Sequence, residues 1–259
     1  MSRIDLEGAI PRDVQPFFPL PAQGPVDVGK MKIIRKPAVA ACLRQWSSEF
    51  LNDAAAIDIF ANLDTVVSHL ANRSARDRHY LRSGVDIDEP WLLPLAHRCL
   101  RLYGRNVTGE NLKAKVPTSN ANPFEEALRH AMLLFHALIR RCFGPPAAGM
   151  GLHVTELILA LDQCLVHDSA MKLQRLIFWM LVVGAMEACN LGWDARWFFE
   201  RIVDGCSILG AQEPQEVEAT VQHAMSELVW LEDALSSSLA LAMHQLKLFM
   251  ESQKACSSE

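Results

Sequence analysis

The chain lacks an excess of positive charge. Its 259 residues include 25 Lys and Arg against 30 Asp and Glu, which gives a formal net charge of −5. Proteins that bind nucleic acid without sequence preference use concentrated Lys and Arg, because covering phosphates releases their counterions. The sequence therefore predicts no direct contact with nucleic acid.

Long apolar runs are missing as well. The longest strongly apolar run, Leu176 to Met186, is shorter than the roughly 20 residues that a helix needs to cross a bilayer. The first residues, MSRIDLEGAIPRD, lack the apolar core of a signal peptide. We therefore expect an intracellular protein, in the cytoplasm or the nucleus, without membrane contact.

The motifs of metal sites and of common enzyme classes are also absent. The 7 cysteines are scattered, mostly among apolar residues, where a free thiol behaves as a small hydrophobe. No pair of them has metal-ligand spacing, the pattern HExxH does not occur, and His153 with Glu156 gives too few ligands for zinc. There is no G-x-S-x-G turn, phosphate-binding loop or dinucleotide fingerprint. The sequence predicts free thiols, no metal and no cofactor.

What the sequence does contain is helical periodicity. Apolar residues recur at helical spacing, and no segment alternates as a half-buried strand does. The clearest helix start is Asn122-Pro123-Phe124-Glu125, where Asn caps, Pro occupies the first turn and Glu completes a capping box. The pattern predicts an all-α fold of about nine helices in one domain, residues 36–259. Pro and Gly in residues 1–35 indicate an irregular N-terminal arm.

Several helix bounds can be predicted in the second half of the chain. The helix over Ala170 to Cys189 is apolar nearly all round from Leu176 to Met186, which is typical of a helix buried by neighbours on several sides. Gly192 and Gly210 are expected to end the two helices before them. The last helix is expected to run from about Ser226 to Met250.

Three residues are candidates for acid–base catalysis: His136, His167 and Glu187. His136 and His130 are six residues apart on one helix, so they point in different directions and cannot bind one metal ion. His167 stands before Asp168 at a corner between helices, where it could be a tuned base, although a helix C-terminal His followed by an Asp cap is the favoured interpretation. Glu187 falls on the apolar helix, where a carboxylate needs a partner, and Arg196 is one candidate across the Gly192 turn.

Aromatic residues offer a second kind of site. They are expected to form the core, although they could also wall a pocket for a flat or apolar molecule between helices. The candidate ligand-binding residues are Trp179, Trp193, Arg196, Trp197 and Trp230.

Two segments carry a family resemblance. Leu173 to Ile202, with Trp179, Gly184 and Arg196-Trp197-Phe198, is followed by Leu228-Val229-Trp230-Leu231-Glu232. Together they resemble the C-terminal half of the regulatory domain of fungal zinc-cluster transcription factors, over about residues 122–250. The resemblance implies a helical regulatory fold and a link to secondary metabolism. The binuclear cluster needs two Cys-x2-Cys-x6-Cys halves, and the chain has neither.

Three functions remain open at this level. The first is a stand-alone regulatory or small-molecule-binding protein that acts through a small apolar molecule or a protein partner. The second is an isomerase or cyclase that uses the same fold on a small apolar metabolite, by acid–base and shape-directed catalysis. The third is a scaffold. The final helix is also a candidate homodimer interface, although its Leu, Met and His positions fit intramolecular packing equally well.

Overall fold

The structure is a computed structural model that describes residues 9, 39–42, 54–76, 93–103, 123–142, 149–165 and 174–257. These residues form helices and the turns between them, with no strand, so the predicted all-α class is confirmed. Apart from Ala9, the predicted arm over residues 1–35 lies outside the described residues. The helices whose bounds fall within the described residues are α3 (Ala54–Arg76), α5 (Leu93–Tyr103), α6 (Pro123–Arg140), α7 (Met150–Leu165), α8 (Gln174–Asn190), α9 (Arg196–Ile208), α10 (Pro214–Glu227) and α11 (Glu232–Ser257).

Helix α6 begins at Pro123, as the Asn-Pro signal predicts, but its burial is wider than the sequence indicates. The spacing predicts one buried face, whereas every residue from Ala127 to Arg140 is buried. The reason is that α3, α5, α7, α8 and α11 all contact α6, and α7 packs on it most extensively. Polar side chains on α6 are therefore enclosed with the apolar ones.

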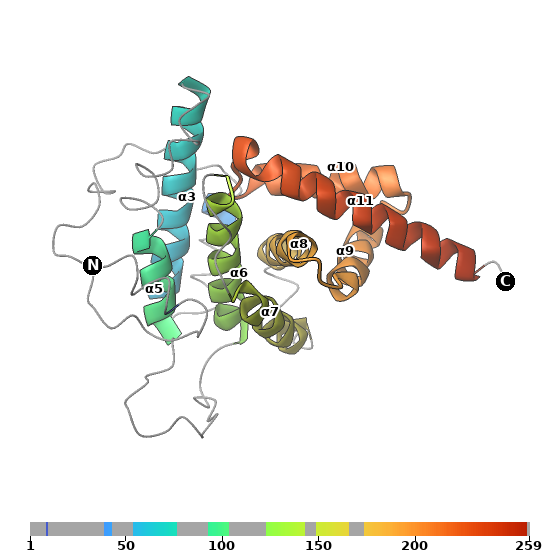
Figure 1. The fold of residues 1–259 in the computed structure, drawn as a ribbon, viewed down its shortest axis with the longest axis horizontal. Coiled ribbons are helices and arrows are strands. Elements are labelled where there is room, and N and C mark those ends of the chain that lie inside the picture. The colour runs from blue at the N-terminus through green and yellow to red at the C-terminus, as the bar shows by residue number, and fades with distance from the viewer. Residues whose placement is uncertain are drawn as a thin grey trace.

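Helix α8 lies at the centre of the second half of the molecule, seen nearly end-on in Figure 1 between α6 and α9. Residues Leu176 to Ala188 are buried except for Phe178, which is half-buried, as the all-round apolar pattern predicts. Helices α6, α7, α9, α10 and α11 all pack against α8. No described helix is long and apolar enough to cross a membrane.

The turn between α8 and α9 is set by Gly192, which has a φ of 69°. The Gly192 amide donates to Cys189 O at 3.1 Å, and the Trp193 amide donates to Ala188 O at 2.9 Å. This is a Schellman motif, in which a left-handed residue after the helix lets its last carbonyls be satisfied. The predicted stop at Gly192 is confirmed, and the motif fixes where Trp193 leaves α8.

The predicted last helix, Ser226 to Met250, is wrong at both ends. Helix α10 ends at Glu227, and α11 runs from Glu232 to Ser257. Between them, Leu228, Val229 and Leu231 are buried in a non-helical connection, and Val229 O accepts a hydrogen bond from Trp179 Nε1 at 3.1 Å. The apolar spacing continues through the break because these residues are buried without being helical, so periodicity cannot reveal it.

Candidate functional site

A surface groove of about 480 Å³ lies where the α8–α9 turn meets the middle of α11. In Figure 1, α11 is the long red helix that runs above α8 and α9 in the view. The volume falls in the range of small-molecule pockets, about 300–1,000 Å³. The lining residues come from the end of α8, the turn, the first half of α9 and one face of α11: Cys189, Gly192, Trp193, Asp194, Ala195, Arg196, Phe199, Leu241, Gln245, Leu248, Phe249 and Ser252.

The groove gathers large apolar side chains that the fold leaves uncovered. Trp193 is 49% exposed, Leu248 46% and Leu241 39%. They are three of the seven large hydrophobic residues that are exposed in the described part of the chain. Single exposed apolar residues are ordinary on protein surfaces, whereas a cluster around a concavity is typical of a binding site.

Trp193 is held in place from behind by α7. A Cβ atom on Gly151 would lie 2.2 Å from Cη2 of Trp193, so only glycine lets the six-membered ring rest on the α7 backbone. The backbone amide of Trp193 is fixed by the Schellman motif. The indole is therefore a positioned wall of the groove although half of it is exposed.

Of the five sequence-predicted ligand-binding residues, the structure brings two into this groove, Trp193 and Arg196. The other three lie elsewhere. Trp197 is half-buried, with its ring 3.8 Å from the Arg201 guanidinium carbon. Trp230 is half-buried and donates to Glu232 Oε2 at 2.6 Å.

Trp179 is a core residue, as one of the two interpretations of the aromatic set predicts. Its side chain is fully buried, and its ring centroid lies 5.6 Å from that of Phe60 and 5.4 Å from that of Phe135. Because its indole N–H already donates to Val229 O, Trp179 presents no polar group to a ligand. It joins α3, α6 and α8 and does not line the groove.

Glu187 is paired, but not with the partner that the sequence suggested. Arg141, which follows α6, donates from Nε to Glu187 Oε2 at 3.1 Å and from Nη2 to Glu187 Oε1. The expectation of Arg196 is wrong because Glu187 faces α6, whereas the Gly192 turn carries Arg196 into the groove. Burial raises the pKa of Glu187, and its hydrogen bonds and ion pair with Arg141 oppose that rise.

The two candidate histidines do not meet Glu187 in a shared site. His136 is buried on α6, where burial first and the Arg140 charge second lower its pKa to about 3. Among the described residues, its Nε2 atom has no hydrogen-bond partner. His167 lies outside the described residues. Neither His136 nor Glu187 lines the groove.

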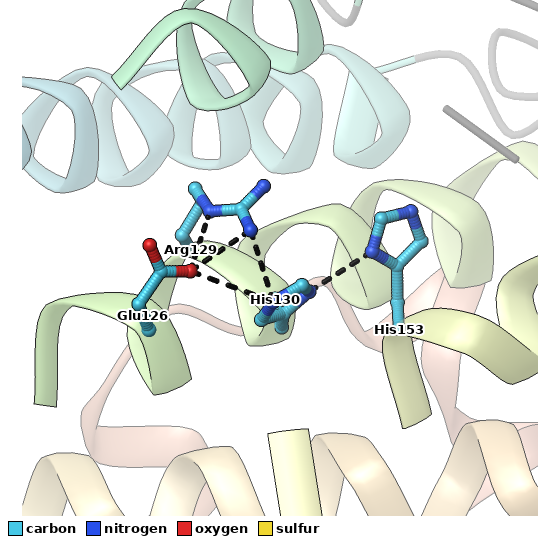
Figure 2. A network of polar contacts seen from close by, with 4 residues as sticks. All are labelled: Glu126, Arg129, His130 and His153. Carbon is cyan, nitrogen blue, oxygen red and sulfur yellow. Dashed lines mark hydrogen bonds and ion pairs between the residues drawn. The ribbon is translucent and has the colours of Figure 1, made fainter. Parts of the chain in front are cut away.

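A second polar cluster, which the sequence did not predict, lies between α6 and α7. Figure 2 shows Glu126, Arg129 and His130 on α6, with the His153 ring reaching His130 from α7. Arg129 donates to Glu126 Oε2 from Nε at 3.1 Å and from Nη2 at 2.9 Å. Arg129 Nη2 lies 3.0 Å from His130 Nε2, and His130 Nδ1 lies 2.9 Å from His153 Nδ1. Arg129 and both histidines are buried, and Glu126 is only partly exposed.

With both histidine rings neutral, the contacts in this cluster determine which ring nitrogen carries each proton. Because a guanidinium only donates, His130 Nε2 must accept from Arg129, which leaves the ring proton of neutral His130 on Nδ1. That proton is donated to His153 Nδ1, so neutral His153 carries its own proton on Nε2. One chain of hydrogen bonds therefore joins Glu126 through Arg129 and His130 to His153, across the most extensive helix interface.

The sequence does not reveal this cluster because its members lie on two helices. Glu126, Arg129 and His130 share a helix face by their spacing of three and four residues, which is a readable signal. The partner His153 is 23 residues away from His130, and only the packing of α7 on α6 brings them together. No group of three or more His, Cys, Asp or Glu in the described residues is placed to hold a metal ion.

The cysteines act as free thiols. None of the seven is in a disulfide; Cys42, Cys99, Cys164 and Cys206 are buried, and only Cys256 is exposed. Cys189 lines the groove, and burial raises its pKa to about 11. A thiol with that pKa is almost entirely protonated near neutral pH, so Cys189 contributes apolar surface to the groove rather than a nucleophile.

Comparisons of the chain with protein-family models, with curated proteins and with solved structures each give no significant match. The resemblance to the regulatory domain of fungal zinc-cluster factors therefore stays a prediction from the sequence.

Proposed function

We propose that this chain is a small-molecule-binding protein of regulatory type, which holds an apolar ligand in the groove between the α8–α9 turn and α11. One observation carries the proposal: Trp193, Leu241 and Leu248 stay exposed around a cavity of about 480 Å³. Covering apolar surface contributes about 25 cal/mol per Å², so a ligand that covers these side chains gains much of its binding energy there.

The groove suits a small molecule because its walls are already built. The Schellman motif at Gly192 fixes the turn, and Gly151 lets the indole of Trp193 rest on α7. The opposite wall is a regular helix, α11. Binding a ligand then costs little free energy for ordering the protein. This favours a small molecule, because a small molecule makes few contacts that could offset such a cost.

The regulatory part of the proposal comes from the family resemblance and from charge. A formal net charge of −5 does not favour contact with DNA, so a partner protein would supply it. The link to secondary metabolism rests on the resemblance alone. Deleting the gene tests this part: loss of every transcript of a neighbouring pathway supports regulation. Accumulation of one intermediate with transcripts intact indicates an enzyme instead.

The alternative of an isomerase or cyclase has no specific observation in its favour. It needs an acid or base that reaches the ligand. Of the residues predicted for that role, His136 is buried away from the groove and Glu187 is occupied by Arg141. The groove itself offers Asp194, whose Oδ1 atom accepts from the Arg196 amide at 2.9 Å.

The proposal is tested with Nile red, a neutral apolar dye that fluoresces when it leaves water. We expect saturable binding by the full chain, and at least tenfold weaker binding by Leu248→Asp, because a carboxylate in the groove disfavours an apolar ligand. The matched control is Leu159→Asp on α7, since Leu159 is 48% exposed and lies outside the groove.

Circular dichroism checks that both variants keep their helix content. Equal weakening by the two substitutions would assign dye binding to general surface hydrophobicity. In that case, or if the unmodified chain does not bind the dye, the groove is not a ligand site.

A further inference from the structure

The charged residues of the groove are not equivalent. Its lining includes one cation, Arg196, and one anion, Asp194. Asp194 is already used: its Oδ1 atom accepts the Arg196 backbone amide at 2.9 Å and so caps the first turn of α9. It takes this role because the N-cap residue, Ala195, has no side-chain oxygen.

The guanidinium of Arg196 is left to the groove. The described residues offer it no ion pair or hydrogen bond, and the side chain is exposed. Arg201, one turn further along α9, differs: it donates to Asp162 Oδ1 at 3.1 Å and stacks over Trp197. Arginine side chains of the same helix therefore have different roles, one structural and one open.

The start of α9 adds to the positive field at this end of the groove. The helix has 13 residues and no acidic residue in its first turn, and helix N-termini carry a partial positive charge. Asp194 offsets part of this field, so recognition of an anion depends on the Arg196 guanidinium rather than on the helix.

The rest of the groove is apolar with two neutral polar groups. Trp193 and Phe199 lie on one side, with Leu241, Leu248 and Phe249 on α11, where Gln245 and Ser252 are the polar residues. Resting on the proposed function, we infer that the ligand is an amphipathic acid. Its apolar body lies against Trp193 and α11, and its carboxylate, or a similar single anionic group, is held by Arg196.

The test uses a matched pair of probes, 1-naphthylacetate and its neutral amide, 1-naphthylacetamide, titrated into the full chain by calorimetry. We expect the acid to bind about tenfold more tightly than the amide, since the carboxylate pairs with the Arg196 guanidinium and the amide does not. Arg196→Gln should remove this preference while leaving the affinity for the amide unchanged. The matched control is Arg175→Gln, which removes one exposed positive charge at the start of α8, outside the groove.

The outcomes separate this inference from the proposed function. If Nile red binds but the acid has no advantage over the amide, or keeps it in Arg196→Gln, the ligand class is wrong and the groove remains a site for apolar molecules. Equal loss of the preference in Arg175→Gln would assign it to net charge and also overturn the inference. If Nile red does not bind, the proposed function itself fails.

Discussion

Gly184 of α8 lies directly against the ring of Phe198 of α9. A Cβ atom on Gly184 would be 2.4 Å from Phe198 Cε1 and 3.0 Å from Leu157 Cδ2, so the three helices meet at a point that has no room for a methyl group. Phe198 and Leu157 are both fully buried, so neither side chain can turn toward solvent to make room. The close approach of α8 and α9, on which the groove is built, depends on this glycine.

We predict that Gly184→Ala destabilises the fold by about 1–3 kcal/mol, because an added methyl group overpacks the core. The control is Gly205→Ala in α9, where the added Cβ would lie 3.5 Å from Phe178, an ordinary contact. That change should stabilise by about 0.5–1 kcal/mol, because alanine favours a helix over glycine. Urea unfolding of both variants checks the pair, and equal effects of the two changes would contradict it.

Breaking the ion pair between Arg141 and Glu187 should lower the free energy of unfolding by an amount that depends on pH. Burial raises the pKa of Glu187, and Arg141 opposes the rise, so Arg141→Met should leave the rise unopposed. A carboxyl whose pKa is higher in the folded than in the unfolded state costs stability as the pH rises past its unfolded value. Arg141→Met should therefore lose about 3 kcal/mol or more at pH 7, and less at pH 5.

The double variant Arg141→Met, Glu187→Gln is the control for this pair. A neutral amide at position 187 removes the buried charge, so the pH dependence of the loss should disappear and part of the stability should return. Urea unfolding at pH 5 and pH 7 measures both variants. The same loss at the two pH values in Arg141→Met would show that the effect comes from lost packing.

The buried His136 should make the fold less stable as the pH falls. Burial and Arg140 lower its pKa to about 3, from 6.5 in an unperturbed chain. A histidine that is neutral when folded and protonated when unfolded costs stability as the pH falls below 6.5. This contribution amounts to about 1.4 kcal/mol per pH unit between the two pKa values. We expect His136→Phe to lose this dependence, so the stability difference from the unmodified chain shifts by about 1.2 kcal/mol between pH 6 and pH 5. A constant difference would contradict it.

The cluster between α6 and α7 predicts two different histidine tautomers. The contacts of His130 Nε2 with Arg129 and of His130 Nδ1 with His153 require the proton on Nδ1 in His130 and on Nε2 in His153. Nitrogen-15 NMR of histidine-labelled protein distinguishes protonated from unprotonated ring nitrogens. The same tautomer in both rings would contradict the assignment.

The hydrogen bond from His130 to His153 should also stabilise the contact between α6 and α7. His153→Leu should cost about 1–3 kcal/mol, because it leaves the His130 donor buried without its acceptor. His153→Gln should cost less, since its carbonyl oxygen can accept the same proton. Thermal unfolding compares the two variants, and equal losses would assign the role of His153 to packing.

The helix content and several helix ends can be read from the sequence. Phe60, Leu63, Val67 and Leu70 recur at helical spacing along α3, and all four are buried. Gly192 and Gly210 end α8 and α9 in left-handed conformations, with φ of 69° and 85°. These features are local: a 3.6-residue period and the steric freedom of glycine act within a few residues, so they can be read from neighbouring letters.

The side-chain partners and the groove, in contrast, depend on how the helices pack. Glu187 meets Arg141, 46 residues earlier, rather than the nearby Arg196, and Trp193 lines a groove while Trp179, equally apolar, is sealed in the core. The break at Leu228–Leu231 is also not visible in the sequence, because buried non-helical residues continue the apolar spacing. Which helix faces meet depends on how whole helices pack. The packing energy is spread over many contacts between segments that are distant in the sequence, so no local pattern reveals it.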